Sequence, residues 1–411
     1  MPTENELRPV SPEARLLQLD VLRGLALFGV LLVNIDAFSG SMWALDAKLP
    51  YPMGWGGPSL IFLRQTLLEG KAAALLGMLF GVGMAIQVES AQSQGRSYTS
   101  FALRRVGALA LLGIAHSFLL WNLDVLLDYA LISLMVMPFL SLRASRLLLS
   151  IPILLLASFA MALPFFPVLD QIKEHPEWFH HWGRQHYGAG SWWEALTFRS
   201  WEMVHFIGPM RLTSRPLALV PFFVLGVYFW KTGLIAAPTR HLQTLRRLFF
   251  ICFSLGLLSN LLPPQVLHPW VADVPQPARA LIKLTAFFAR PALMVGYAAG
   301  VLLLLQGNWW RTKLSLLAPL GRMALTQYLL QSVVCTWIFN GYGLGLYGKV
   351  PMDVCILGGV ALFAIQVWSS RVWIARWRMG PAEWLWRRVT YGTRKPTSVG
   401  DHRSAHAFRA Y

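Results

Sequence analysis

Apolar segments long enough to cross a lipid bilayer recur along almost the whole chain, and they constrain its fold more than any other feature. A helix needs about 20 apolar residues to cross the hydrocarbon core, and a spanning segment must satisfy its own backbone hydrogen bonds there. The segments that meet this requirement are 19–38, 59–88, 103–121, 125–142, 147–169, 203–230, 248–267, 281–306, 314–339 and 354–373. We therefore predict an all-α, polytopic membrane protein with about ten transmembrane helices.

The composition and the charge pattern agree with a membrane protein. Hydrophobic residues make up 55% of the chain and charged residues 13%, a balance too apolar for an ordinary soluble surface. The net charge of +17 would suggest a nucleic-acid partner in a soluble protein, but here the basic residues form short runs between apolar segments, as in cytoplasmic loops. We expect no nucleic acid, and both termini in the cytoplasm. The basic residues that fall on this side are Arg96, Arg104, Arg105, Arg143, Arg146, Lys231, Arg240, Arg246, Arg247, Arg311 and Lys313.

The chain divides into a cytoplasmic N-terminal segment (1–18), a single transmembrane domain (19–392) and a tail (393–411) that we expect to be disordered and cytoplasmic. Within the domain, segment 170–202 is rich in Trp and His and is expected to lie outside, along the headgroups. A metal site is the alternative there, but the spacing of His175, His180, His181 and His186 matches no standard ligand pattern. We therefore expect no metal.

Ionisable side chains within the apolar segments are the strongest indication of a site, because burying one in a bilayer costs a few kcal/mol or more. Asp20 and Arg23 lie three residues apart on one face of the first predicted span. They would bind a ligand entering from the cytoplasm, or form a salt-bridged anchor at the start of the helix.

A histidine and several polar residues lie at the far end of the third predicted span. His116 is about 20 Å from the cytoplasmic start of that helix, and Asn34 lies at a similar depth in the first span. His116 is soon followed by Asn122, Asp124 and Asp128. A neutral imidazole oriented by a carboxylate is the arrangement of a general base, so His116 with Asp124 is the best candidate catalytic pair. A hydrogen-bonded histidine that only fills space is the alternative.

Further polar groups in apolar segments are candidates for binding a substrate or a donor. Lys71 and Arg290 would form a cationic cavity for a phosphate-bearing donor, or pair with acids inside the protein. Gln327 and Gln331 share one helix face and would line the site or hydrogen-bond to neighbouring helices. The remaining candidates are Asp128, Tyr129 and Arg322. The sequence contains no Walker loop, GxSxG elbow, HExxH motif or dinucleotide fingerprint.

Several motifs occur in the order of a known family. They are residues 15–34 (RLLQLDVLRGLALFGVLLVN), 79–83 (LFGVG), 113–117 (GIAHS), 121–129 (WNLDVLLDY), 321–332 (GRMALTQYLLQS) and 380–387 (GPAEWLWR). Together they resemble the YeiB-like family of bacterial inner-membrane proteins over nearly the whole chain. The last motif is amphipathic and aromatic, and it would anchor the chain at the inner leaflet or gate a donor entrance.

The resemblance implies a distant relation to transmembrane acyltransferases such as heparan-α-glucosaminide N-acetyltransferase. Those enzymes begin with a similar Asp-x-x-Arg-Gly and use a histidine to pass an acyl group from cytosolic acyl-CoA to a sugar across the membrane. Their histidine follows the first span closely, but residues 39–58 here contain none, so the role falls to His116. Asp124 would orient its ring, and Asn34 would hydrogen-bond the reacting carbonyl.

Three functions remain open from the sequence. The first is transfer of an acyl group, expected to be acetyl, from an acyl-CoA donor to a hydroxyl or amino group of an envelope glycan or small metabolite. The second is a transporter or lipid flippase with a buried proton or ion relay, and the third is a non-catalytic scaffold. The acceptor is unknown, and the chain is a possible homo-oligomer.

Overall fold

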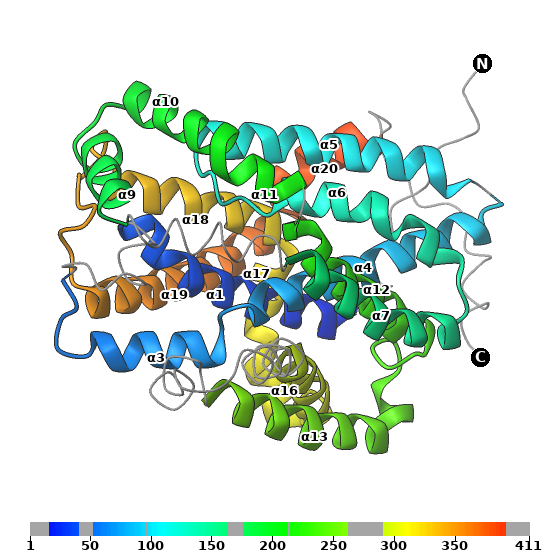
Figure 1. Cartoon of the computed structure of the whole chain (residues 1–411). Coiled ribbons are helices and arrows are strands. Elements are labelled where there is room, and N and C mark those ends of the chain that lie inside the picture. Colours follow the sequence, from blue (N-terminus) through cyan, green and yellow to red (C-terminus); the bar gives the residue numbers. More distant parts are fainter. Residues whose placement is uncertain are drawn as a thin grey trace, which may run out of the picture.

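The computed structural model describes residues 16–40, 52–95, 97–162, 176–212, 214–261 and 291–391, and the regular elements within these ranges are all helical (Figure 1). The predicted all-α class is confirmed. The helices of the first half are α1 (Leu17–Ser39), α3 (Gly57–Leu67), α4 (Lys71–Ser93), α5 (Tyr98–Leu119), α6 (Leu126–Val136), α7 (Ala144–Ala162), α9 (Pro176–Gly183) and α10 (Trp192–Glu202). The later helices are α11 (Gly208–Leu212), α12 (Ser214–Lys231), α13 (Leu242–Leu261), α16 (Asn308–Leu314), α17 (Ala318–Arg322), α18 (Ala324–Phe339), α19 (Met352–Arg376) and α20 (Pro381–Tyr391).

Six helical segments in the described ranges are long and apolar enough to cross a membrane, or seven if the bent pair Pro291–Leu304 and Asn308–Arg322 is one span. The shorter apolar helices are Leu126–Ser141, Pro216–Lys231 and Ala324–Phe339. The expected total of about ten spans, and the cytoplasmic termini, stay predictions. Arg290, His175, the start of the eighth predicted span, the 393–411 tail and most of segment 1–18 lie outside the described residues.

Helix α1 lies inside the bundle, in contact with α4, α17, α18 and α19 (Figure 1). Its sequence is apolar nearly all round, which is typical of a helix buried on every side. Glycines allow the closest of these contacts, since a Cβ atom on Gly321 would lie 1.8 Å from the carbonyl oxygen of Asp20. The start of α1, with Asp20 and Arg23, is thereby held against α17.

Helices α4 and α12 also cross with their backbones almost touching. A Cβ on Gly81 would lie 2.0 Å from the carbonyl oxygen of Phe223, and one on Gly226 would lie 1.9 Å from that of Met78. Small residues at helix crossings are typical of membrane proteins, where close van der Waals packing holds helices together. Helix α4 begins after Gly70, whose φ of 77° is in the left-handed region, so the predicted span 59–88 is divided here between α3 and α4.

A third close approach joins α5 to the start of α6. A Cβ on Gly113 would lie 2.4 Å from the backbone nitrogen of Leu127, so only glycine allows the chain to return this tightly after α5. The connecting turn, residues 120–125, therefore lies beside the last turns of α5. This places the acids that follow α5 next to His116.

The final helix, α20, packs on α5 and α18 and caps the start of α18. The Glu383 carboxylate accepts hydrogen bonds from the backbone nitrogens of Leu325 at 2.7 Å and Thr326 at 3.0 Å, and from the Thr326 hydroxyl at 2.5 Å. The first amides of a helix have no partner within it. Here α20 supplies that partner, so the position of α20 is tied to that of α18.

Candidate active site

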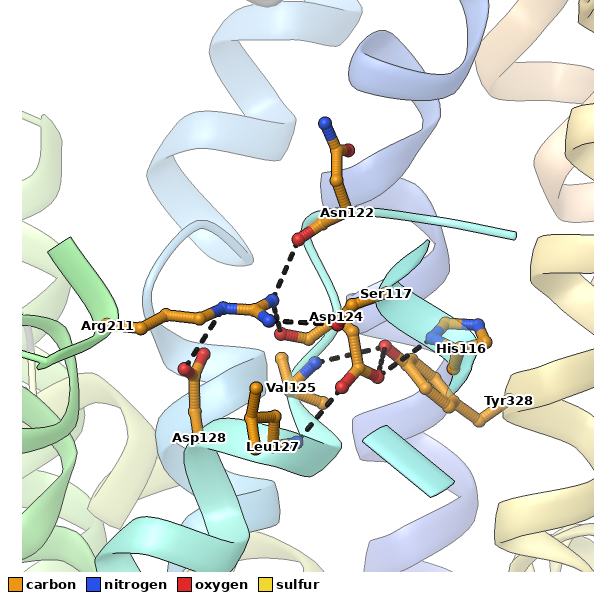
Figure 2. A network of polar contacts seen from close by, with 9 residues as sticks. All are labelled: His116, Ser117, Asn122, Asp124, Val125, Leu127, Asp128, Arg211 and Tyr328. Carbon is orange, nitrogen blue, oxygen red and sulfur yellow. Dashed lines mark hydrogen bonds and ion pairs between the residues drawn. The ribbon is translucent and has the colours of Figure 1, made fainter. Parts of the chain in front are cut away.

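His116 and Asp124 form a buried pair at the turn between α5 and α6. The Nδ1 atom of His116 lies 2.9 Å from Oδ1 of Asp124, and the two residues are 2% and 0% exposed. The other carboxylate oxygen, Oδ2, accepts a hydrogen bond from the backbone nitrogen of Leu127 at 3.0 Å (Figure 2). The structure therefore brings together the two residues that the sequence paired.

The hydrogen bond to Asp124 assigns the tautomer of His116. A carboxylate accepts hydrogen bonds, so the ring hydrogen of His116 lies on Nδ1 and leaves a lone pair on Nε2. Nε2 is buried and has no hydrogen-bond partner within the part of the chain that the structure describes. Buried polar atoms nearly always have a partner, so this nitrogen is available to take a proton from a bound molecule.

Tyr328, on α18, is the third member of the cluster. Its hydroxyl donates to Oδ1 of Asp124 at 3.0 Å and accepts from the backbone nitrogen of Val125 at 3.2 Å. Its ring centre lies 5.3 Å from that of His116. The sequence did not single out Tyr328, although it lies in motif 321–332, because a tyrosine in an apolar helix is common.

Arg211, on α11, fastens the other side of the turn, opposite His116 and Tyr328 in Figure 2. Its guanidinium donates to the Ser117 hydroxyl at 2.9 Å and to the carbonyl oxygens of Asn122 at 2.8 Å and Asp124 at 2.5 Å. Its Nε lies 3.3 Å from a carboxylate oxygen of Asp128, and both residues are almost fully buried. Asp128, a predicted binding residue, thus lies in an ion pair that organises the turn.

A cavity of about 290 Å³ lies between α1, α4, α5, α18 and α20 and ends close to this cluster. The charged residues that line it are Arg23, Arg105, Arg322, Arg387 and Glu383. Tyr328 and Val125 form part of its wall, whereas His116 and Asp124 do not line it. Four arginines against one glutamate make this cavity, hereafter the arginine cavity, attractive to an anion.

The arginines of the cavity are held by neighbouring groups. The guanidinium of Arg105 lies 5.0 Å from the ring centre of Phe80 and 4.9 Å from that of Trp386, and it hydrogen-bonds Gln87. Arg23 pairs with Asp20 at 3.1 Å. Since Trp386, Arg387 and Glu383 all belong to α20, the amphipathic final motif forms one wall of the cavity.

The other predicted site residues lie apart from the His116 cluster. Asn34 is half-buried on α1 and, among the described residues, makes no hydrogen bond to His116 or Asp124. Lys71 is buried and donates to the carbonyl oxygen of Gln65 at 3.1 Å. Tyr129 donates to the carbonyl oxygen of Ala73 at 2.9 Å and lines the arginine cavity, as do Arg23 and Arg322.

Gln327 and Gln331 bind the neighbouring helix α19. The amide nitrogen of Gln327 donates to the Ser370 hydroxyl at 2.8 Å, and that of Gln331 donates to Oε1 of Gln366 at 2.9 Å. These contacts correspond to the helix-packing alternative for the two glutamines.

A second polar cluster lies on the α10 side of the turn. Oε2 of Glu202 accepts hydrogen bonds from Asn122 at 2.6 Å and from the Tyr187 hydroxyl at 2.5 Å. Burial raises the pKa of Glu202 to about 7, although these hydrogen bonds and the charge of Arg199 oppose the shift. Across the described ranges no three His, Cys, Asp or Glu side chains gather closely enough to hold a metal ion.

Comparison with known proteins finds relatives over almost the whole chain. YxaH of Bacillus subtilis (strain 168), an uncharacterised protein, is 33% identical over 95% of this chain and 98% of its own length. A family model described as a protein of unknown function (DUF418) matches residues 229–393. The chain belongs to this DUF418 family.

Two further relatives are less similar. The uncharacterised protein YeiB of Escherichia coli (strain K12) is 27% identical over 90% of this chain and 95% of its own length. An uncharacterised 39.9 kDa protein of Bacillus acidopullulyticus is 26% identical over 94% and 97%. No solved structure matches. The YeiB-like resemblance is thereby confirmed. The names of these relatives assign no activity to them.

Proposed function

We propose that this protein is a transmembrane acyltransferase that moves an acyl group, acetyl in the simplest case, from a cytosolic acyl-CoA to a hydroxyl or amino group of an envelope glycan or small metabolite. The observation that carries the proposal is the buried Nε2 of His116, which has a lone pair and no partner among the described residues, while Asp124 holds the other ring nitrogen. This is the arrangement that a general base requires.

The proposed reaction balances with His116 as the proton carrier. Nε2 takes the proton from the acceptor hydroxyl or amine as its oxygen or nitrogen attacks the thioester carbonyl. The carbon–sulfur bond then breaks, and the leaving CoA thiolate takes the proton from the imidazolium. Asp124 stabilises that imidazolium through Nδ1. The products are an ester or amide and free CoA, and His116 returns to its starting state.

The arginine cavity supports a donor that carries phosphates. Arginine binds phosphate oxygens through charge-assisted hydrogen bonds, and Arg23, Arg105 and Arg387 line the cavity together. A volume of about 290 Å³ is at the lower end for ligand pockets, so the cavity would hold part of a CoA thioester. These arginines belong to the side that the charge pattern assigns to the cytoplasm, where acyl-CoA is available.

The alternative of a transporter or flippase with a proton relay has less support. The guanidinium of Arg211 lies between Asp128 and the Asp124 turn and is always protonated, so it does not pass protons along that route.

The bacterial relatives support a place in the inner (plasma) membrane as a multi-pass protein.

The test uses the whole protein in nanodiscs with radiolabelled acetyl-CoA, and measures acetyl-CoA hydrolysis and transfer to added amines, sugars and envelope extracts. His116→Ala should lower either rate at least about a hundredfold, the usual contribution of a general base. The matched control is His205→Ala, since His205 is an exposed histidine whose Nδ1 lies 2.9 Å from the carbonyl oxygen of Trp201 and which does not line the arginine cavity. Equal rates in wild type and His116→Ala would refute the proposal.

A further inference from the structure

Tyr328 stands between the arginine cavity and the histidine that the chemistry needs. The residue lines the cavity, and its ring is also close to the His116 ring. It is only 4% exposed. The residue therefore has one face toward the space where a ligand would bind and one toward the base.

His116 itself does not line the cavity. On α5 the cavity is lined by Arg105 and Leu109, and His116 follows Leu109 by seven residues, about 10 Å further along the helix. Val125 and Tyr328 occupy the cavity wall in this direction. A molecule in the arginine cavity does not touch Nε2 while Tyr328 stays in place.

We propose that Tyr328 is a movable partition between the arginine cavity and His116, held in place by the hydrogen bond from its hydroxyl to Asp124 (hereafter the latch). Rotation of the Tyr328 side chain into the cavity would open the way to His116. The same rotation would release Oδ1 of Asp124, which would then bind His116 alone. The proposal rests on the proposed role of His116 as the base. The cavity beside the ring provides the room for the swing. Tyr328 is in this view a positioning residue, because it acts through Asp124.

The shared oxygen links the two effects. Oδ1 of Asp124 contacts both Nδ1 of His116 at 2.9 Å and the Tyr328 hydroxyl at 3.0 Å. When Tyr328 leaves, Oδ2 keeps its bond from Leu127, and Oδ1 serves His116 only. A carboxylate oxygen with fewer donors is a stronger acceptor, so Oδ1 would hold the Nδ1 hydrogen, and with it the orientation of the His116 ring, more firmly. Opening the path and fixing the His116 ring would then be one event, which coincides with the arrival of a ligand.

The latch is weak enough to open. The hydroxyl of Tyr328 makes one hydrogen bond to Asp124 and receives one from the Val125 nitrogen. A single intramolecular hydrogen bond of this kind changes an equilibrium by only about tenfold. A carbonyl or hydroxyl group of an entering ligand would replace the lost acceptor for the Val125 nitrogen.

The test measures access to the position of His116 and needs no acyl transfer. Three variants of the full chain are prepared in nanodiscs. All carry His116→Cys, and position 328 is the native tyrosine in the first, phenylalanine in the second (Tyr328→Phe) and alanine in the third (Tyr328→Ala). The modification rate by the anionic thiol reagent 2-sulfonatoethyl methanethiosulfonate is then followed by mass spectrometry of each cysteine peptide. Loss of the latch in Tyr328→Phe should raise the rate about tenfold, the equivalent of one hydrogen bond. Tyr328→Ala, which removes the partition, should raise it further.

Two internal controls separate access from general loosening. Cys335, on the same helix as Tyr328, is 1% exposed and should stay unmodified in all variants. Tyr129→Phe removes another cavity hydroxyl, one bonded to the carbonyl oxygen of Ala73, and should leave the rate at His116→Cys unchanged.

Three outcomes would overturn the proposal: fast modification with Tyr328 intact, no change in Tyr328→Phe, or a parallel rise at Cys335. A negative result in the acetyl-CoA assay together with the expected access changes would remove the proposed function and leave the partition standing. Acetyl-CoA turnover without the expected access changes would support the proposed function and refute the partition.

Discussion

The turn that holds His116 and the arginine cavity are both polar places in an apolar bundle, but they are built in opposite ways. At the turn, side chains, including that of Arg211, and backbone groups satisfy one another at fixed distances, and within the described ranges only Nε2 of His116 is left over in the His116–Asp124 pair. In the cavity, long arginines rest on rings and carbonyl oxygens around a space. Fixed geometry suits a reaction step, and adaptable charge suits binding.

The sharpest way to break this comparison is Asp124→Asn. The amide keeps the shape of the carboxylate but loses its charge. Its NH2 group can donate to an unprotonated Nδ1, so the ring hydrogen of His116 would no longer be held on Nδ1. Activity should fall by about 10³ to 10⁴, as expected when the orienting carboxylate of a histidine base is lost. Binding of CoA, measured by titration, should stay within about twofold, because the cavity is lined by other residues. A large loss of CoA binding would mean that the two regions are one site.

The second change tests whether Arg211 is structural. Arg211→Met removes the guanidinium that forms a buried ion pair with Asp128, at a cost of about 3 to 5 kcal/mol in stability. The measurement is thermal unfolding in detergent by intrinsic tryptophan fluorescence. Arg211→Met with Asp128→Asn should recover part of the loss, because the double variant removes both charges of the ion pair together. A single variant as stable as wild type would show that the turn does not depend on this ion pair.

The smallest expected effect belongs to the cavity. Arg387→Gln should weaken CoA binding about tenfold, the scale of one charge-assisted hydrogen bond, and the loss should shrink as salt is raised. Turnover at saturating donor should change little. Arg388→Gln is the matched control, since Arg388 is the next residue on α20 but is exposed and does not line the cavity. Equal weakening in both variants would indicate a diffuse surface charge in place of a binding site.

The sequence predicted the parts of the molecule that depend on neighbours in the chain. Long apolar segments predicted the helical membrane architecture, and His116 and Asp124 were paired because they are eight residues apart across one turn. The motifs that follow one another along the chain were enough to identify the family.

The parts that the sequence did not predict come from distant helices. Tyr328 reaches Asp124 across 204 residues, and Arg211 reaches its carbonyl oxygen across 87. Arg211 carried a usable signal, since it is a cation within the predicted span 203–230, and Tyr328 carried a weaker one, its place in motif 321–332. Asn34 is not hydrogen-bonded to His116 or Asp124 in the described residues, because equal depth along two helices does not set the face on which each side chain lies.

The cap that Glu383 places on α18 has a consequence for how the protein is made. The backbone amides of Leu325 and Thr326 donate to a carboxylate, that of Glu383, which lies 58 and 57 residues later in the chain. During synthesis, the helix that bears Tyr328 therefore leaves the ribosome with an unfinished first turn, and the cavity lacks the wall that carries Trp386. A chain cut short before α20 would lack Glu383, Trp386 and Arg387, so the arginine cavity is complete only after α20 has been made.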